Sequence, residues 1–258
     1  MNNITVIIFT PRDDANIKDC VNSAKLLTEN VILVYPTSTY VETVRESGIR
    51  QSKTDWVFIL DVDERMTKEL AEEINVILGR NKVTTPESKK DSGPASTSRR
   101  RDEQARMTYY KIPRKNIFDA KKWLRHGGWW PDYQIRLINK KYFVGWPKRI
   151  HSTPKIKEDV GFLKNPILHY FHGDLEKMVE KTLVFEDIES NLLYKAGKSA
   201  DTSTFFRKYF AELWRRMFKG LGFLDGTVGI IESIYQAFSK TITYLLLYEK
   251  RQRKGQNL

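Results

Sequence analysis

The stretch WVFILDVDERM, Trp56 to Met66, is the most informative part of the chain about its fold. Its first five residues are largely apolar, and they lead directly into three carboxylates within four residues: Asp61, Asp63 and Glu64. A short apolar run that ends in polar residues is typical of a buried strand. In open parallel sheets, ligands bind beyond the carboxyl ends of the strands. The three acids therefore stand where a binding site is expected.

Alternating strand and helix patterns surround this stretch. The β-branched runs Ile4–Phe9 and Val31–Tyr35 predict two further strands, and helical spacing of apolar residues follows each strand. Thr67 is expected to cap the third helix, which should end near Gly79. This alternation predicts an α/β fold whose mostly parallel sheet is flanked by helices. From Tyr109 onward, aromatic residues and glycines between short extended runs predict a smaller β-rich subdomain.

The patterns divide the chain at about residue 172. Residues 1–172 should form the α/β domain, with a polar, charged and mobile insertion at about 85–106. Residues 173–258 should form a C-terminal helical region. With 258 residues, of which 40% are hydrophobic, the chain is long enough to bury a sizeable core.

Charge and cysteine content limit the classes of partner. The formal net charge of +12 indicates an anionic partner or serves solubility alone. No recognised nucleic-acid motif accompanies the charge, so nucleic acid is not expected as a partner. Cys20 is the single cysteine, which excludes an internal disulfide. No secretory signal is visible and no apolar run approaches the roughly 20 residues that span a bilayer. The sequence predicts a cytoplasmic protein.

Asp61 and Asp63 are candidate metal ligands. If the chain stays extended, their side chains point to the same side of the strand, because side chains alternate with a period of two. Two carboxylates on one side favour a hard cation such as Mg²⁺ or Mn²⁺, which can neutralise a diphosphate. The alternative is that Asp63 and Glu64 only stabilise the positive end of the following helix.

A second polar pattern occurs in HGGWWPDYQIRL, His126 to Leu137. In an extended chain, Asp132, Gln134 and Arg136 project to one side. A carboxylate can act as a general base, and arginine can bind phosphate oxygens. The alternative is a half-buried strand whose exposed face carries an ordinary Asp–Arg pair.

The order of these motifs resembles family 2 glycosyltransferases, especially those of bacterial lipopolysaccharide-core synthesis. The resemblance covers most of Ile4 to His172 apart from the charged insertion. The stretches that carry it are ITVIIFTPRDDANIKDCVNSAK, YVETVRESGI, TDWVFILDVDERMTKELAEEI, YYKIPRKN, HGGWWPDYQIRLINK, RIHSTP and ILHYFH.

This resemblance implies a GT-A fold and an inverting transfer from a nucleotide-sugar donor to a saccharide or lipid-linked acceptor in cell-envelope glycan synthesis. It implies a divalent metal on Asp61 and Asp63, with His151 as a candidate further ligand, and Asp132 as the base that deprotonates the acceptor hydroxyl. His169 also lies where such enzymes often carry histidine. The residues expected to bind the donor are Thr10, Pro11, Asp14, Arg45, Asp61, Arg114, Gln134 and Arg136.

The chain departs from the family pattern after its second strand. Val31–Tyr35 runs almost directly into the helix that ends near Ile49, and Tyr40 follows Ser38-Thr39 where the family has an aspartate-bearing turn. A β-α unit that helps to hold the nucleoside is therefore expected to be missing. The alternative function that follows is a catalytically impaired, membrane-associated binding protein of the same fold.

The last part of the chain, Phe205 to Leu258, combines aromatic and basic residues. Apolar side chains recur every four residues from Phe205 to Leu221, with arginines and lysines between them. Such a segment is typical of an interfacial helix on an anionic lipid surface. The alternative is packing against the rest of the protein. The first interpretation predicts peripheral attachment to the cytoplasmic face of the inner membrane.

Overall fold

The computed structural model describes residues 3–36, 41–81, 107–149, 152–157, 159–171 and 175–255. The chain divides into two compact units. The first comprises Met1–Arg114 and Tyr133–His169, and the second comprises Lys115–Asp132 and Tyr170–Leu258. This division differs from the expected boundary near residue 172, because the segment Lys115–Asp132 groups with the C-terminal helices. The expected insertion at 85–106 lies outside the described residues.

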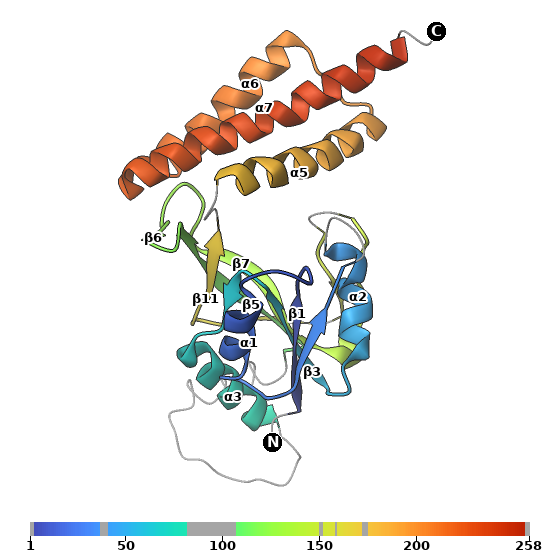
Figure 1. Cartoon of the computed structure of the whole chain (residues 1–258), viewed down its shortest axis with the longest axis vertical. Coiled ribbons are helices and arrows are strands. Elements are labelled where there is room, and N and C mark those ends of the chain that lie inside the picture. Colours follow the sequence, from blue (N-terminus) through green and yellow to red (C-terminus); the bar gives the residue numbers. More distant parts are fainter. Residues whose placement is uncertain are drawn as a thin grey trace. The chain divides into compact units, whose positions relative to one another are not determined.

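A mixed β-sheet forms the centre of the first unit (Figure 1). Its strand order is β2-β1-β3-β7-β5-β11-β4, and β10 pairs with β5. The ends of β5, β7 and β11 belong to the second unit. The strands are β1 (Ile4–Phe9), β2 (Val31–Val34), β3 (Trp56–Asp61), β4 (Glu64–Arg65), β5 (Tyr109–Phe118), β7 (Asp132–Asn139), β10 (Val160–Phe162) and β11 (Ile167–Phe171).

The predicted strands of the first half are confirmed, but the sheet is less parallel than expected. Strand β1 pairs in parallel with β2 and β3, whereas β7 runs antiparallel to β3. The strands after Tyr109 extend this same sheet. Only a two-stranded sheet of β8 (Phe143–Gly145) and β9 (Lys155–Ile156) is separate from it among the described residues. Sequence alternation shows which face of a strand is buried, but not which neighbour it pairs with.

Helices cover both faces of the sheet. Helices α1 (Ile17–Ala24) and α3 (Lys68–Asn81) contribute to one apolar cluster, and α2 (Glu42–Gln51) contributes to the other. Strand β3 supplies both clusters alternately: Phe58 and Leu60 belong to the first, and Val57 and Ile59 belong to the second. Because side chains alternate, Asp61 continues the series of Val57 and Ile59 and so faces α2.

The structure shows where α3 begins and ends and how β2 is connected to α2. Thr67 caps α3 as predicted, because Leu70 N donates a hydrogen bond to Thr67 Oγ1 at 3.2 Å. Helix α3 extends to Asn81, two residues beyond Gly79, near which it was predicted to end. Only residues 35–41 connect β2 to α2, and Ser38-Thr39-Tyr40 lie outside the described residues. So short a connection leaves no room for a further strand and helix between β2 and α2.

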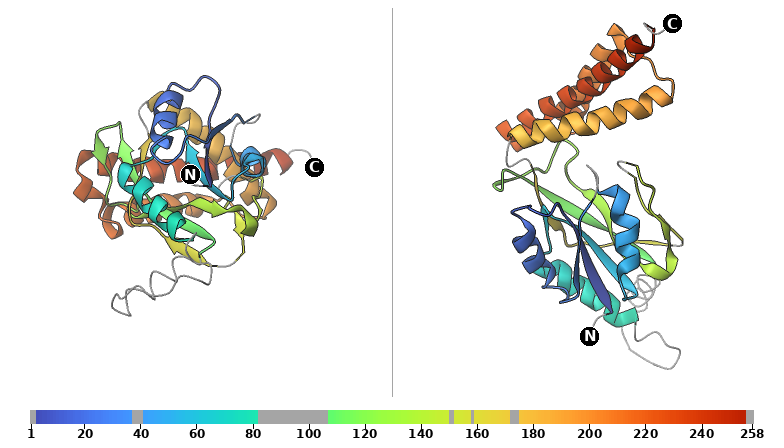
Figure 2. Two further views of the ribbon diagram at one scale, coloured as in Figure 1. Left: turned by 90° about the horizontal axis from the view of Figure 1, so that it is seen from below. Right: turned by 45° about the vertical axis from the view of Figure 1, so that its right-hand side comes forward.

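Three long helices form most of the second unit. Helix α7 packs along both α5 and α6, and the three lie side by side in Figure 1 and in Figure 2. The elements are β6 (Lys122–Trp123), which pairs with the end of β5, α5 (Leu175–Lys195), α6 (Thr202–Trp214), the π-helical turn η2 (Arg215–Lys219), the 3₁₀ turn η3 (Gly222–Asp225) and α7 (Thr227–Gly255). Of the helices in the described ranges, none combines the length and apolar composition needed to cross a membrane.

Glu232 on α7 makes the stability of the helical unit depend on pH. Its side chain is fully buried, and burial raises its pKa to about 7, against smaller lowering effects of a hydrogen bond with Gln236 and the charge of Arg216. Folding disfavours the ionised form of a carboxyl group whose pKa it raises. This penalty is absent below ~4.3, the pKa in an unfolded chain, and it grows as the pH rises through the folded pKa.

We therefore expect Glu232→Gln to stabilise the protein at pH 8 by about 2–4 kcal/mol, with the gain shrinking towards zero near pH 4. Urea unfolding at both pH values measures this difference. The matched control is Glu249→Gln on the same helix, where the side chain is half exposed. It should change the free energy of unfolding little at either pH. An equal effect of Glu232→Gln at pH 4 and pH 8 would contradict the prediction.

Candidate active site

Asp61 stands at the carboxyl end of β3, between two buried arginines. Arg45 Nη2 on α2 lies 2.9 Å from Asp61 Oδ1, and Arg136 Nη2 on β7 lies 2.6 Å from Asp61 Oδ2. The Arg45 guanidinium also lies 5.1 Å from the ring centres of both Phe9 and Trp146. These contacts bring together three of the residues that the sequence analysis assigned to the donor site: Asp61, Arg45 and Arg136.

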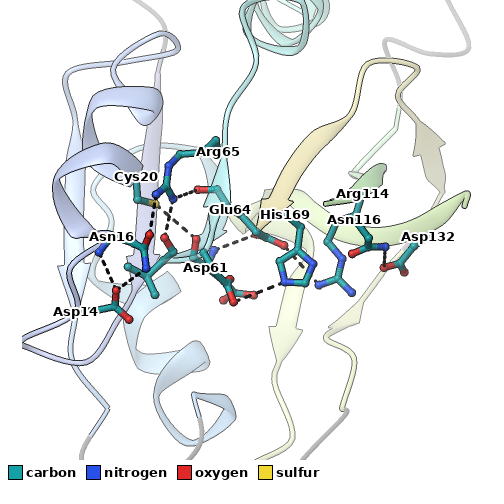
Figure 3. A network of polar contacts seen from close by, with 12 residues as sticks. Asp14, Asn16, Cys20, Asp61, Glu64, Arg65, Arg114, Asn116, Asp132 and His169 are labelled. Carbon is teal, nitrogen blue, oxygen red and sulfur yellow. Dashed lines mark hydrogen bonds and ion pairs between the residues drawn. The ribbon is translucent and has the colours of Figure 1, made fainter. Parts of the chain in front are cut away.

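Glu64 is a further member of this cluster, and sequence reasoning placed it only at a helix end. Its side chain is fully buried, and its Oε2 accepts a hydrogen bond from Asp61 N at 3.0 Å. Its Oε1 lies 2.6 Å from Arg136 Nη2. The same oxygen lies 3.6 Å from Arg114 Nη1 (Figure 3). Glu64 therefore closes the turn after β3 and anchors two arginines. Glu64 lies in β4 opposite His169 of β11, and no local pattern in the sequence predicts this pairing.

The cluster holds three guanidinium groups around two carboxylates. Burial alone would raise the pKa of Asp61, but the charges of Arg136 and Arg45 outweigh it and hold this pKa well below its usual range. Burial would lower the pKa of Arg136, but Asp61 and Glu64 outweigh it and raise the pKa above its usual value. Asp61 and Arg136 are consequently charged at neutral pH. Counted as formal charges, the cluster has one positive charge in excess.

Two of the buried donors in this cluster have no hydrogen-bond partner in the part of the chain that the structure describes. They are Arg45 Nη1 and Arg136 Nε. The side chains of Arg45 and Arg136 are only 8% and 5% exposed. A buried donor without a partner costs about 1–3 kcal/mol, and more when the group is charged. The excess positive charge of the cluster and its two buried donors without a partner among the described residues both favour an anionic ligand.

Asp61 and Asp63 make different contacts, because the extended chain does not continue through the acids. Strand β3 ends at Asp61, and a turn over Val62 and Asp63 separates it from β4. The expectation of simple alternation between Asp61 and Asp63 is therefore wrong. Asp63 instead approaches β11, where its Oδ2 lies 3.6 Å from His169 Nε2.

Asp63 and His169 fit a divalent cation better than Asp61 does. Two ligands that bind one ion at ~2.1 Å stand ~3.0–3.5 Å apart, close to the separation of these two polar atoms. Both oxygens of Asp61 already accept hydrogen bonds from guanidinium groups. No group of three or more acidic, histidine or cysteine side chains suited to a metal occurs among the residues described. His151 lies outside those residues.

The expected donor turn follows β1, beside the carboxyl end of β3. Phe9 of β1 is the parallel partner of Asp61, so Thr10 begins at the same edge of the sheet. Thr10 is fully buried, and its hydroxyl donates to the carbonyl of Pro11 at 2.8 Å. Asp14 Oδ1 accepts from Asn16 N at 2.8 Å and so shapes the next turn. Thr10 and Asp14 therefore act as turn-forming residues in this structure.

Asp132 begins β7, the strand that carries Gln134 and Arg136 two and four residues later. Within the second unit, Asp132 Oδ2 accepts a hydrogen bond from Asn116 Nδ2 at 3.2 Å (Figure 3). Asn116 is fully buried, and the same nitrogen donates to the Trp129 carbonyl at 3.0 Å. Sequence reasoning missed Asn116, although it lies in the quoted stretch YYKIPRKN.

Comparisons with known proteins bear on the class of this protein. No protein-family model matches the chain. Curated proteins of Rickettsia species are similar to it, and each is named an uncharacterized glycosyltransferase. The one from Rickettsia typhi is 25% identical, and the similarity covers 96% of this chain and 88% of the relative. Those from Rickettsia prowazekii and Rickettsia conorii are 26% and 23% identical, covering 93% and 95% of this chain and 85% and 90% of the relatives.

Proposed function

We propose that the protein is an inverting glycosyltransferase that moves a sugar from a nucleotide-sugar donor to a saccharide or lipid-linked acceptor. The names of its Rickettsia relatives support the class, since the similarity spans nearly the whole of this chain and of each relative. The finer assignment to family 2, with a GT-A fold and a role in lipopolysaccharide-core synthesis, rests on the motif resemblance.

The buried arginine cluster is the observation that carries the proposal. A nucleotide sugar presents a diphosphate, which leaves with additional negative charge as the glycosidic bond breaks. Arg45, Arg114 and Arg136 lie at the carboxyl end of β3, and two of them have buried N–H groups without a partner among the described residues. Arginine binds phosphate oxygens through two parallel hydrogen bonds. The cluster would bind the diphosphate and stabilise the developing charge on the leaving group.

A divalent metal, Mg²⁺ or Mn²⁺, would be held by Asp63 and His169, with Asp61 beside them. When bound, such an ion neutralises charge on the diphosphate as a Lewis acid. In this arrangement Asp61 has a second role, because it keeps Arg45 and Arg136 ionised and oriented.

Asp132 would be the base that removes the proton from the acceptor hydroxyl. Asn116 fixes the position of the Asp132 carboxylate by donating to its Oδ2. An amide donor stabilises the ionised carboxylate, which is the form that accepts a proton. A positioned base contributes roughly 10²–10⁴-fold to a rate.

The helical unit supports membrane attachment. Four exposed aromatic residues recur at every fourth position and define an aromatic stripe: Phe206, Phe210, Trp214 and Phe218, with exposed fractions of 62%, 58%, 63% and 51%. Basic residues stand between and after them in the sequence: Arg207, Lys208, Arg215, Arg216 and Lys219. An exposed apolar patch beside positive charge suits the surface of an anionic bilayer. Such attachment would bring the enzyme to a lipid-linked acceptor on the cytoplasmic face of the inner membrane.

We expect uridine or guanosine diphosphate to bind more tightly in the presence of Mn²⁺ than in its absence. In Asp63→Ala this enhancement should disappear, because one of the two proposed ligands is lost. Isothermal calorimetry with and without Mn²⁺ measures the difference. Asp55→Ala is the matched control: this exposed carboxylate precedes β3 at its other end. An unchanged Mn²⁺ dependence in Asp63→Ala would contradict the metal assignment and leave the arginine cluster to be tested by Arg136→Ala.

We expect Asp132→Asn to retain donor affinity and to lose roughly 10²–10⁴-fold in turnover, because the amide cannot accept the proton. Release of nucleoside diphosphate from a panel of nucleotide sugars, with saccharide acceptors and with bacterial lipid extract, measures the rate. The control is Asp119→Asn, since Asp119 lies in a turn of the same segment, Lys115–Asp132, with its side chain about half exposed. If nucleotides bind but the wild-type protein turns over no sugar in the panel, the alternative of a catalytically impaired binding protein gains support, as the shortened β2–α2 connection suggests.

We expect the full-length protein to float with vesicles that contain anionic lipid and to dissociate in high salt, because screening weakens the charge attraction. A double variant of Trp214→Ser and Phe218→Ser should bind roughly 10²–10⁴-fold more weakly, since each buried aromatic side chain contributes about 1.5–3 kcal/mol. Leu183→Ser with Leu192→Ser, on α5, is the control for loss of exposed apolar area. Equal loss in both double variants would show that the aromatic stripe is not the membrane contact.

A further inference from the structure

The loop from Arg125 to Asp132 forms hydrogen bonds with a buried carboxylate, Asp225, in the turn η3 between helices α6 and α7. Asp225, at the end of η3, is only 5% exposed. Its Oδ2 accepts hydrogen bonds from the backbone N–H groups of Arg125 and His126, each at 2.8 Å. Its Oδ1 lies 2.9 Å from His126 Nδ1. One side chain thus contacts three polar groups at the start of the loop, although they are far away in the sequence.

Two further contacts hold the centre of this loop. Gly127 N donates to the carbonyl of Gly220 at 2.6 Å, and Arg216 Nη1 donates to the carbonyl of Gly127 at 3.1 Å. The fit is close, because a Cβ atom on Gly220 would lie 3.0 Å from the Gly127 Cα. Gly127 and Gly128 also have φ angles of +67° and +85°, which disfavour any residue with a side chain.

The far end of the loop is held by Asn116. Its side-chain nitrogen contacts both the Trp129 carbonyl and the Asp132 carboxylate, at 3.0 and 3.2 Å. The Trp129 ring packs against Phe171 at 4.9 Å and under the Arg216 guanidinium at 5.3 Å. A displacement of the loop near Asp225 would therefore also move Trp129 and Asp132, the two residues that Asn116 contacts.

We propose that Asp225 is a positioning residue for Asp132. The proposal rests on the proposed function, in which Asp132 is the base. Asp225 itself is separated from Asp132 by the length of the loop, so it acts by fixing the backbone that leads to the carboxylate. Its buried position is explained by this role, since burial of a carboxylate is costly unless hydrogen bonds compensate for it. A misplacement of a catalytic group by about 1 Å can reduce a rate by ~10²-fold.

The test combines hydrogen–deuterium exchange with kinetics on the full-length protein. In the wild type, the amides of Arg125, His126 and Gly127 should exchange slowly. In Asp225→Ala they should exchange at least tenfold faster, and turnover of the best nucleotide sugar in the panel should fall by ~10–100-fold with unchanged donor affinity. Asp225→Asn keeps an oxygen that can accept from both amides, so it should restore most of the protection and most of the turnover.

The control is Asp201→Ala in the same unit. Asp201 caps α6 by accepting from Thr204 N at 2.7 Å, and its loss should cost ~1 kcal/mol of stability without affecting the loop. Slow exchange and normal turnover in this variant would show that lost stability alone does not explain the effect of Asp225→Ala. Equal losses of turnover in both variants would overturn the proposal.

Gly220→Ala gives a second perturbation should Asp225→Ala fail to fold. The added methyl group would press on Gly127, so exchange at that amide should rise and turnover should fall. Unchanged exchange and turnover in this variant would also overturn the proposal. If the wild type turns over no nucleotide sugar, the proposed function fails, whereas the exchange data still decide whether Asp225 holds the loop.

Discussion

The arrangement of the strands around the candidate site in the first unit depends on neutralising the buried guanidinium of Arg136. Arg136 has two carboxylate partners, Asp61 and Glu64, each 2.6 Å away. Removing one partner from a buried ion pair typically costs about 3–5 kcal/mol, because the other charge remains uncompensated. The end of β3, the turn that follows it and the strand that carries Arg136 must therefore keep fixed positions. The same constraint keeps Asp61 ionised and leaves an excess of positive charge at the edge where a diphosphate is proposed to bind.

The antiparallel insertion of β7 beside β3 makes this cluster possible. In that register Phe58 pairs with Leu137 and Val57 pairs with Ile138. Arg136 therefore lies on the same face as Ile138 and Asp61, where α2 presents Arg45. A parallel or more distant β7 would put its arginine elsewhere, and Asp61 would lack its shortest ion-pair contact. The mixed sheet is thus a requirement of the site.

In the second unit, the turn η2 contributes both to the loop that leads to Asp132 and to the aromatic stripe. The turn η2 holds Arg216, which binds the loop that leads to Asp132, and also Phe218 of the aromatic stripe. Sequence reasoning recognised the stripe, because spacing by four is a local property of a helix. It did not recognise Asp225 or Asn116, since nothing in GFLDG or RKNIF distinguishes a buried loop anchor from an ordinary turn or strand residue.

Local sequence patterns were sufficient to predict the strands β1, β2 and β3, the helices that follow them, and the acids at the carboxyl end of β3. These features depend on periodicity and capping, which act over a few residues. The same patterns placed Asp132, Gln134 and Arg136 on one strand. The pairing of β7 with β3, the burial of Glu64 between arginines, the approach of Asp63 to His169 and the anchoring of the loop by Asp225 became visible only in the folded chain. Each of these depends on groups far apart in the sequence, and alternation fixes the face of a strand but not its neighbour.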